Sequence, residues 1–192
     1  ELYKQCPFRA FAERVLRIED KVQESSLDLS RLEEGSFVHK VLELYYRDHN
    51  GRNVLDPEER ARVLDLCVEQ AAGKIRIEYY KGNERLFEAQ LARLRGLLLN
   101  FLQLDGEQYA RFPFFSSVEV EKEVGGELEG GLRWRGKIDR VDYDEANRRF
   151  LVTDYKIGAS PPANADVNEL KRFQLQLYVD AVEAERQGDR KS

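Results

Sequence analysis

The chain has 192 residues, a formal net charge of −5, 42% hydrophobic residues and 35% charged residues. This length supports one substantial hydrophobic core, and the composition is that of an ordinary globular domain. No run approaches the ~20 apolar residues of a membrane-spanning helix, and the net charge by itself argues against a general nucleic-acid binder.

The N-terminal segment is predicted to form a short helix over residues 3–16, with Cys6 and Pro7 at its start, where proline is well placed. The chain does not begin with Met and shows no signal-peptide layout, so we expect it to be a piece of a longer protein. Cys6 and Cys67 are too few for a disulfide framework, and we expect a reducing compartment, the cytoplasm.

A second helix is predicted to follow the polar connector 23–30. The run Ser30-Arg31-Leu32-Glu33 is a capping box, which places the helix start there, and the apolar pattern ends near Asp48. His39 and Glu43 are four residues apart and lie on the same side of this helix. A single histidine on an amphipathic helix is usually structural, so the residues alone leave its role open.

Two longer helices are predicted over residues 57–80 and 84–109. Pro57 stands at the first helical position and acids follow it, as the helix dipole favours. Cys67 belongs to the apolar stripe of the first of these helices and is interpreted as a small core residue. This helical section carries no chemistry that the sequence identifies.

The first strand is predicted over residues 114–124, where polar and apolar residues alternate. Its acids are expected to face solvent, although Glu119 or Glu121 could approach a metal. The glycine-rich run 125–131 is predicted to be a flexible turn.

A hairpin is predicted over residues 132–158, with alternating strands on either side of the four-residue loop 145–148. This loop pairs Asp144 with Arg149 and Asp142 with Leu151, and it places Asp139 opposite Asp154.

Two carboxylates that face each other within a hairpin repel, and a divalent cation between them turns that repulsion into ligation. Lys156 lies two residues from Asp154 and shares its face. The bland alternative is a surface hairpin with solvated charges. Against it, Asp139 and Asp154 are embedded in apolar β-formers and do not lie at the turn. The pattern predicts a metal-dependent phosphodiesterase site.

A last helix is predicted over residues 167–187. It places Lys171, Gln174 and Tyr178 on one side, where they could contact nucleic acid, although such a surface is also common without function. Basic residues gather around the candidate site and are expected to support phosphate contact; they are Arg133, Arg135, Lys137, Arg140, Arg148, Arg149, Lys156, Lys171 and Arg172.

Five segments in order resemble the PD-(D/E)XK nuclease superfamily, and within it the RecB/AddB-type exonuclease domains, which are related to the CRISPR-associated RecB-like nucleases. The segments are CPFRAF (6–11), GSFVHKVLE (35–43), GKIDRVD (136–142), VTDYKIG (152–158) and QLQLY (174–178). The resemblance implies an α/β fold with a restriction-endonuclease-like core, in which helices flank a central mixed sheet. It implies a single nuclease domain with a helical insertion at about 50–112, a core at about 1–49 and 113–192, and a C-terminal part that is missing.

The resemblance also implies roles. Asp139 would be the first acid, and Asp154-Tyr155-Lys156 the (D/E)XK tripeptide. His39, Asp139, Asp154 and the Tyr155 carbonyl would hold Mg²⁺ or Mn²⁺, and Lys156 would position water or stabilise the transition state. Glu43 would orient the site or reach a second metal through water. Gln174, Tyr178 and Lys171 would hold DNA.

In relatives of this kind, a segment like Cys6-Pro7-Phe8 supplies the first of four cysteine ligands to an iron–sulfur cluster. The other three are absent from this sequence, and Cys67 cannot replace them. Cys6 would therefore be a cluster ligand only in a longer chain.

The function that the resemblance implies is a metal-dependent deoxyribonuclease, an exonuclease of DNA recombination or repair. Its substrate would be single-stranded DNA or duplex ends. Its partner would be a helicase domain or subunit, and no membrane would be involved. A catalytically silent nuclease fold that grips DNA as a scaffold is the alternative, and an endonuclease would have the same site. Cleavage polarity, the choice of Mg²⁺ or Mn²⁺ and the oligomeric state are left open.

Overall fold

The computed structural model describes residues 29–48, 56–78, 84–112, 115, 117–127, 131–157 and 174–188, together with residues 8 and 11. The chain divides into two compact units, one of residues 1–26 and 161–173 and one of residues 27–160 and 174–192. Every helix and strand below belongs to the second unit. Our predictions for Cys6, Lys171, the helix at 3–16 and the start of the last helix lie outside the described residues.

Three helices form one layer of this unit: α3 (Arg31–Asp48), α4 (Pro57–Glu78) and α5 (Glu84–Arg111). The predicted capping box is present, because the Glu33 N–H donates to Ser30 Oγ and the Ser30 N–H donates to the Glu33 carboxylate. The helices pack around an apolar core that includes Phe37, Val41, Tyr45, Leu64, Cys67, Phe87, Leu94 and Leu102. Cys67 is therefore a core residue, as its position in the apolar stripe predicts.

The sheet has three antiparallel strands in the order β1 (Ser117–Glu127), β2 (Arg133–Asp144) and β3 (Arg149–Thr153). The predicted hairpin register is confirmed, because Asp144 pairs with Arg149 and Asp142 with Leu151 across a turn at 145–148. The Asp144 carboxylate closes this turn by accepting bonds from Asn147 and Arg149.

The strand bounds differ from the prediction at two places. β1 continues to Glu127, so Gly125 and Gly126 are strand residues and not a flexible turn; they pair with β2, and a Cβ at Gly125 would lie 2.9 Å from the Trp134 carbonyl oxygen. β3 ends at Thr153, and residues 154–157 leave the ladder. The described strands are all antiparallel, without the parallel pairing that a mixed sheet would have among them.

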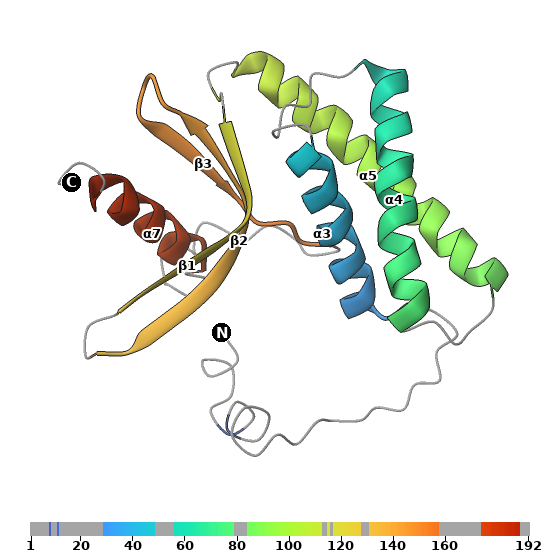
Figure 1. Cartoon of the computed structure of the whole chain (residues 1–192), viewed down its shortest axis with the longest axis horizontal. Helices are drawn as coiled ribbons and strands as arrows, with labels where there is room; N and C mark the ends of the chain where they lie inside the picture. Colours follow the sequence, from blue (N-terminus) through green and yellow to red (C-terminus); the bar gives the residue numbers. More distant parts are fainter. Residues whose placement is uncertain are drawn as a thin grey trace. The chain divides into compact units, whose positions relative to one another are not determined.

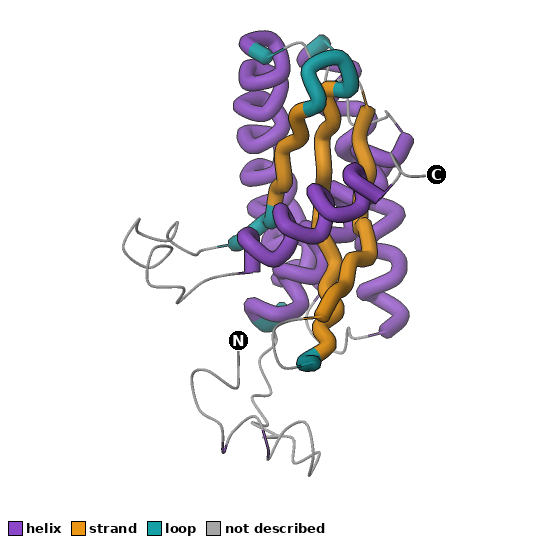
Figure 2. Tube along the Cα trace, turned by 90° about the vertical axis from the view of Figure 1, so that its left-hand side faces the viewer, coloured by secondary structure: helices purple, strands orange, loops and turns teal. Residues whose placement is uncertain are grey.

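The helix α7 (Gln174–Gly188) covers the sheet face opposite the α3–α5 layer, as Figures 1 and 2 show. A second core lies between α7 and the sheet, formed by Ile138, Val141, Tyr143, Tyr178 and Val182. The unit is thus an α/β arrangement in which helices flank a central sheet, as predicted. Among the described helices, none has the length and apolar character to cross a membrane.

Candidate metal centre

The centre of the candidate site is a contact between α3 and β2. His39 Nδ1 lies 3.1 Å from Asp139 Oδ1, and His39 Nε2 lies 3.0 Å from the carbonyl oxygen of Tyr155. The Tyr155 N–H donates to Asp139 Oδ2 at 2.6 Å. Three residues from distant parts of the sequence therefore hold one another, and Asp139 is only 8% exposed.

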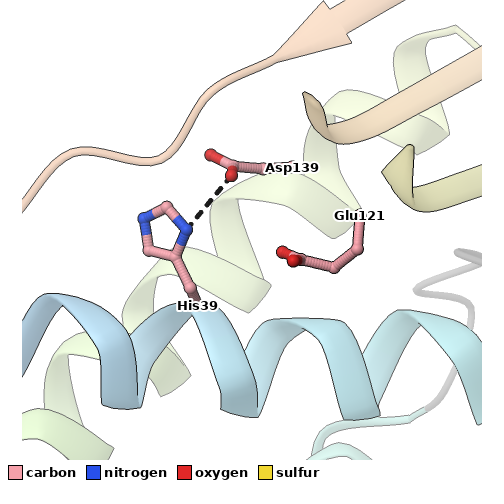
Figure 3. A group of neighbouring side chains, drawn as sticks. All are labelled: His39, Glu121 and Asp139. Atoms are coloured by element: carbon pink, nitrogen blue, oxygen red, sulfur yellow. Dashed lines mark ion pairs between the residues drawn. The ribbon is translucent and has the colours of Figure 1, made fainter. Parts of the chain in front are cut away.

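Glu121 of β1 completes this group (Figure 3). One carboxylate oxygen of Glu121, one ring nitrogen of His39 and one carboxylate oxygen of Asp139 all lie within 4.8 Å of one another. Glu121 also forms an ion pair with Lys137. The expectation that the β1 acids face solvent is wrong for Glu121, which lies beside His39 of α3. The alternative that Glu119 or Glu121 could approach a metal agrees with this position.

The backbone explains why the alternating pattern misplaced Glu121. Its φ is 55°, in the left-handed region that residues with a Cβ rarely adopt. The register is the same on both sides, with Val120 opposite Arg140 and Lys122 opposite Ile138, so no residue is inserted. From Glu121 onward the alternation of faces along β1 is shifted by one residue, since Val120 packs on the helical core and Val124 on the core against α7, while the pairing with β2 is unchanged. Period-two alternation carries no signal for such a change.

Asp154 and Lys156 form a neighbouring cluster with α7. Lys156 Nζ lies 2.9 Å from Asp154 Oδ2, and Gln174 Nε2 donates to Asp154 Oδ1 at 3.2 Å. Gln174 also donates to the Tyr178 hydroxyl at 3.0 Å. Asp154 is not one of the three residues within 4.8 Å of one another. The β2–β3 ladder ends at Arg140–Thr153, so the predicted pairing of Asp139 with Asp154 is not part of the ladder.

Tyr178 has a different position from the one that a DNA contact requires. The residue is 6% exposed, and its ring packs against Trp134 and Gly136. So buried a ring is not available to stack on a base; its hydroxyl accepts a hydrogen bond from Gln174, which also donates to Asp154.

Two pKa shifts follow from these contacts. The hydrogen bond to Asp139 raises the pKa of His39; burial opposes this, and the charge of Asp139 and the Tyr155 carbonyl add to it. For Lys156, burial lowers the pKa, but the hydrogen bond to Asp154 and its charge outweigh burial and raise it. Lys156 therefore carries a stable positive charge beside the acids.

Glu43 lies beside the group formed by His39, Glu121 and Asp139 and is not one of its three members. Its carboxylate pairs with Lys40 at 2.7 Å and with Arg47, both on α3. It lines a cavity of about 350 Å³ together with His39, Glu121 and Lys74, so two of the three grouped side chains line this cavity.

Arg140 is not part of a basic surface, which corrects one expectation. It is 2% exposed and its guanidinium binds Asp105 and Asp142 in the interior. Lys137 and Arg149 are exposed, and each pairs with an acid, Glu121 and Asp144 respectively. A count of nearby basic residues in the sequence therefore overstates the charge that is free to meet phosphate.

The donor set fits a divalent cation. An imidazole and two carboxylates lie within 4.8 Å of one another, and the Tyr155 carbonyl lies beside the second ring nitrogen of that imidazole. Oxygen ligands with one imidazole suit Mg²⁺ or Mn²⁺ chemistry. Both ring nitrogens of His39 face oxygen atoms, so a proton occupies a place that a cation can take. Among the described residues this is the one group of three or more such side chains.

Comparison with known proteins identifies the family of this chain. The profile of the PD-(D/E)XK nuclease superfamily matches residues 1–192. The chain is similar to proteins whose name makes them a subunit of an ATP-dependent helicase/deoxyribonuclease: it is 30% identical to that of Symbiobacterium thermophilum over 95% of the chain and 17% of the relative. The protein of the same name from Clostridium botulinum strain Hall is 25% identical over 95% of the chain and 17% of the relative, and that of Desulfitobacterium hafniense strain DCB-2 is 27% identical over 95% and 16%.

The chain thus spans about a sixth of the length of these relatives. No solved structure matches it significantly. The match over the full length, together with the hairpin register and the α/β arrangement, shows that this chain belongs to the PD-(D/E)XK nuclease superfamily.

Proposed function

We propose that the chain is a metal-dependent deoxyribonuclease domain, an exonuclease that hydrolyses DNA phosphodiester bonds in recombination or repair. The observation that carries this proposal is the convergence of His39, Glu121 and Asp139 from three separate elements. The names of the relatives, which join a helicase and a deoxyribonuclease, support a DNA substrate and a helicase domain or subunit as partner. A cytoplasmic location fits such a role.

We assign the cation to His39, Asp139, Asp154 and the Tyr155 carbonyl, with Glu121 as an added ligand. His39, Asp139 and Tyr155 already contact one another. Asp154 adjoins Tyr155 in the chain, and its carboxylate is bonded by Lys156 and Gln174. Mg²⁺ and Mn²⁺ both fit this set.

When bound, a divalent cation supplies charge neutralisation on a phosphate oxygen and lowers the pKa of water. Lys156 holds a positive charge next to Asp154, where it can orient water or stabilise negative charge that develops on phosphate. Gln174 donates to Asp154 and fixes the orientation of that carboxylate. Asp139 accepts from the Tyr155 N–H and so holds the Tyr155 carbonyl in place.

For DNA contact we retain Gln174 and Lys171 as candidates, and Tyr178 as the residue that holds Gln174. Lys156 is 54% exposed at its side chain and is available to a phosphate. An iron–sulfur cluster that uses Cys6 remains a proposal for a longer chain.

The test is cleavage of end-labelled single- and double-stranded DNA with Mg²⁺, with Mn²⁺ and with EDTA. Asp139→Asn and Asp154→Asn are expected to lose cleavage and to retain DNA binding. Asp180→Asn is the matched control, because Asp180 is an exposed acid on α7 whose carboxylate accepts a hydrogen bond from Gln176, one turn away on the same helix. Full cleavage by Asp154→Asn would refute the assignment of Asp154, and a wild-type chain that neither cuts DNA nor binds metal would favour the silent scaffold.

A further inference from the structure

Along β2, the regular alternation of side chains between the two faces of the sheet is interrupted at the candidate metal centre. Trp134, Gly136 and Ile138 contact the α7 side, as the ring of Tyr178 and the second core show. Val141 and Tyr143 lie in that same core. A regular strand alternates faces, so Ile138 and Val141, three residues apart, cannot share a face unless the alternation slips between them.

The slip places two consecutive residues on the helical side. Asp139 meets His39 of α3, and Arg140 meets Asp105 of α5. The strand β1 changes face at the same level: Glu119 contacts Lys122, and Lys122 reaches Glu185 of α7. Val120 packs on the helical core and Glu121 lies beside His39. The left-handed φ of Glu121 marks the change on this strand.

Arg140 connects the part of β2 where the alternation slips, Asp139 and Arg140, to the helical layer. Its Nη2 and Nη1 lie 2.8 Å and 3.0 Å from the two carboxylate oxygens of Asp105, a bidentate pair. Its Nε donates to Asp142 at 2.9 Å, and its guanidinium lies 4.4 Å from the ring centre of Tyr46. The Tyr46 hydroxyl donates to Asp105 Oδ2 at 2.6 Å.

Both the guanidinium and the carboxylates of this network are buried. The side chain of Arg140 is 3% exposed, that of Asp142 is 1% exposed and that of Asp105 is 10% exposed. A buried ion pair is weak evidence for stability, because desolvation offsets its attraction. The two parallel hydrogen bonds of a bidentate pair do define how the guanidinium and the carboxylate are oriented. Arg140 is covalently next to Asp139, so the orientation of the guanidinium restrains the backbone that carries the acid.

We propose that Asp105 and Arg140 are positioning residues, through which α5 holds Asp139 in the orientation that a bound metal needs. The inference rests on the proposed function, and it gives the helical insertion a role beyond packing. Neither residue contacts the metal-ligating atoms. They act on the orientation of Asp139 through the backbone of β2, at the point where its alternation slips.

The test compares Asp105→Asn with Asp65→Asn. Asp65 of α4 forms a carboxylate–guanidinium pair with Arg95 of α5, but that pair is half-exposed and includes no residue of β2. Mn²⁺ affinity is measured by calorimetry in the absence of DNA, well below the thermal midpoint of each variant, and kcat and KM are measured on single-stranded DNA. We expect Asp105→Asn to weaken Mn²⁺ binding by about tenfold or more, as loss of orienting partners does in metal sites, and to lower kcat with little change in KM. Asp65→Asn should change none of these.

Arg140→Lys keeps the charge and removes the bidentate fork, so it should show the same loss if Asp105→Asn fails to fold. Restoration of Mn²⁺ affinity toward the wild-type value by Asp105→Glu would support positioning by charge. Wild-type Mn²⁺ affinity in a folded Asp105→Asn or Arg140→Lys variant would overturn the inference while leaving the nuclease proposal intact. Absence of Mn²⁺ binding by the wild type would instead reject the proposed function, and the inference with it.

Discussion

Gly136 on β2 lies so close to Tyr178 on α7 that a Cβ at position 136 would be 2.6 Å from Tyr178 Cε1. The ring of Tyr178 is buried and cannot move aside as the end of a flexible side chain could. Gly136→Ala should therefore destabilise the domain by about 1–3 kcal/mol, the usual cost of overpacking. Denaturant unfolding measures this change.

Gly96→Ala is the control for this substitution. Gly96 lies inside α5 and has no atom within 4 Å of a Cβ built there, so alanine should be neutral or should stabilise by about 0.5–1 kcal/mol. Because Tyr178 holds Gln174, Gly136→Ala is also expected to reduce cleavage more than its stability loss accounts for. Equal stability of the two variants would contradict the contact.

Glu121 combines a ligand position with an unfavourable backbone. A residue with a Cβ in the left-handed region costs about 1–2 kcal/mol, so Glu121→Gly should be at least as stable as the wild type. The same variant should bind Mn²⁺ about tenfold more weakly or worse, because it lacks the carboxylate. Thermal melts and calorimetry measure the two effects separately.

Glu123→Gln provides the comparison, since Glu123 is exposed on the same strand. It should leave both stability and Mn²⁺ affinity unchanged. If Glu121→Gln binds Mn²⁺ as tightly as Glu123→Gln does, Glu121 is not a ligand.

The pH dependence of stability should report His39. Its pKa in the folded, metal-free protein is raised above the ordinary value of 6.5, chiefly by the hydrogen bond to Asp139. The folded state then binds the proton more tightly than the unfolded state, so the stabilisation is fully present below 6.5 and is lost as pH rises through the folded pKa. In EDTA, the stability difference between wild type and His39→Gln should shrink as the pH rises above 6.5 and through the folded pKa of His39.

Saturating Mn²⁺ should change this trend, because the cation and the proton compete for the same nitrogen. The difference between wild type and His39→Gln should then grow with pH. A difference that is constant with pH in EDTA would show that the His39–Asp139 contact does not form in solution.

The backbone and the side chain of Tyr155 make different contacts. Its N–H and carbonyl hold Asp139 and His39, while its ring packs in the helical core against Phe101. Its hydroxyl is buried and has no hydrogen-bond partner among the described residues. Tyr155→Phe should therefore keep metal binding and leave stability unchanged or about 1 kcal/mol higher.

Tyr155→Ala should instead cost about 3–5 kcal/mol, because it empties a buried aromatic site. Both variants are compared by denaturant unfolding and Mn²⁺ titration. A loss of more than about 1 kcal/mol in Tyr155→Phe would mean that the hydroxyl is hydrogen-bonded after all.

The sequence by itself determined the local geometry of this protein. Alternation and a four-residue loop set the register that pairs Asp142 with Leu151, and caps at Ser30 and Asp56 set two helix starts. These features depend on residues close in sequence, where backbone periodicity and hydrogen-bonding rules decide the outcome. The family motifs added the expectation that His39, Asp139 and Asp154 work together.

Only the tertiary structure decided which face each residue of the site takes. The contact of His39 with Asp139 joins residues 100 positions apart, and it exists because α3 packs on the sheet. Glu121 reaches the site through one left-handed residue, and Arg140 leaves the surface because both strands change face together. Periodicity predicts faces while a strand stays regular, and at the metal centre it is the packing of helices against an irregular strand that places the acids.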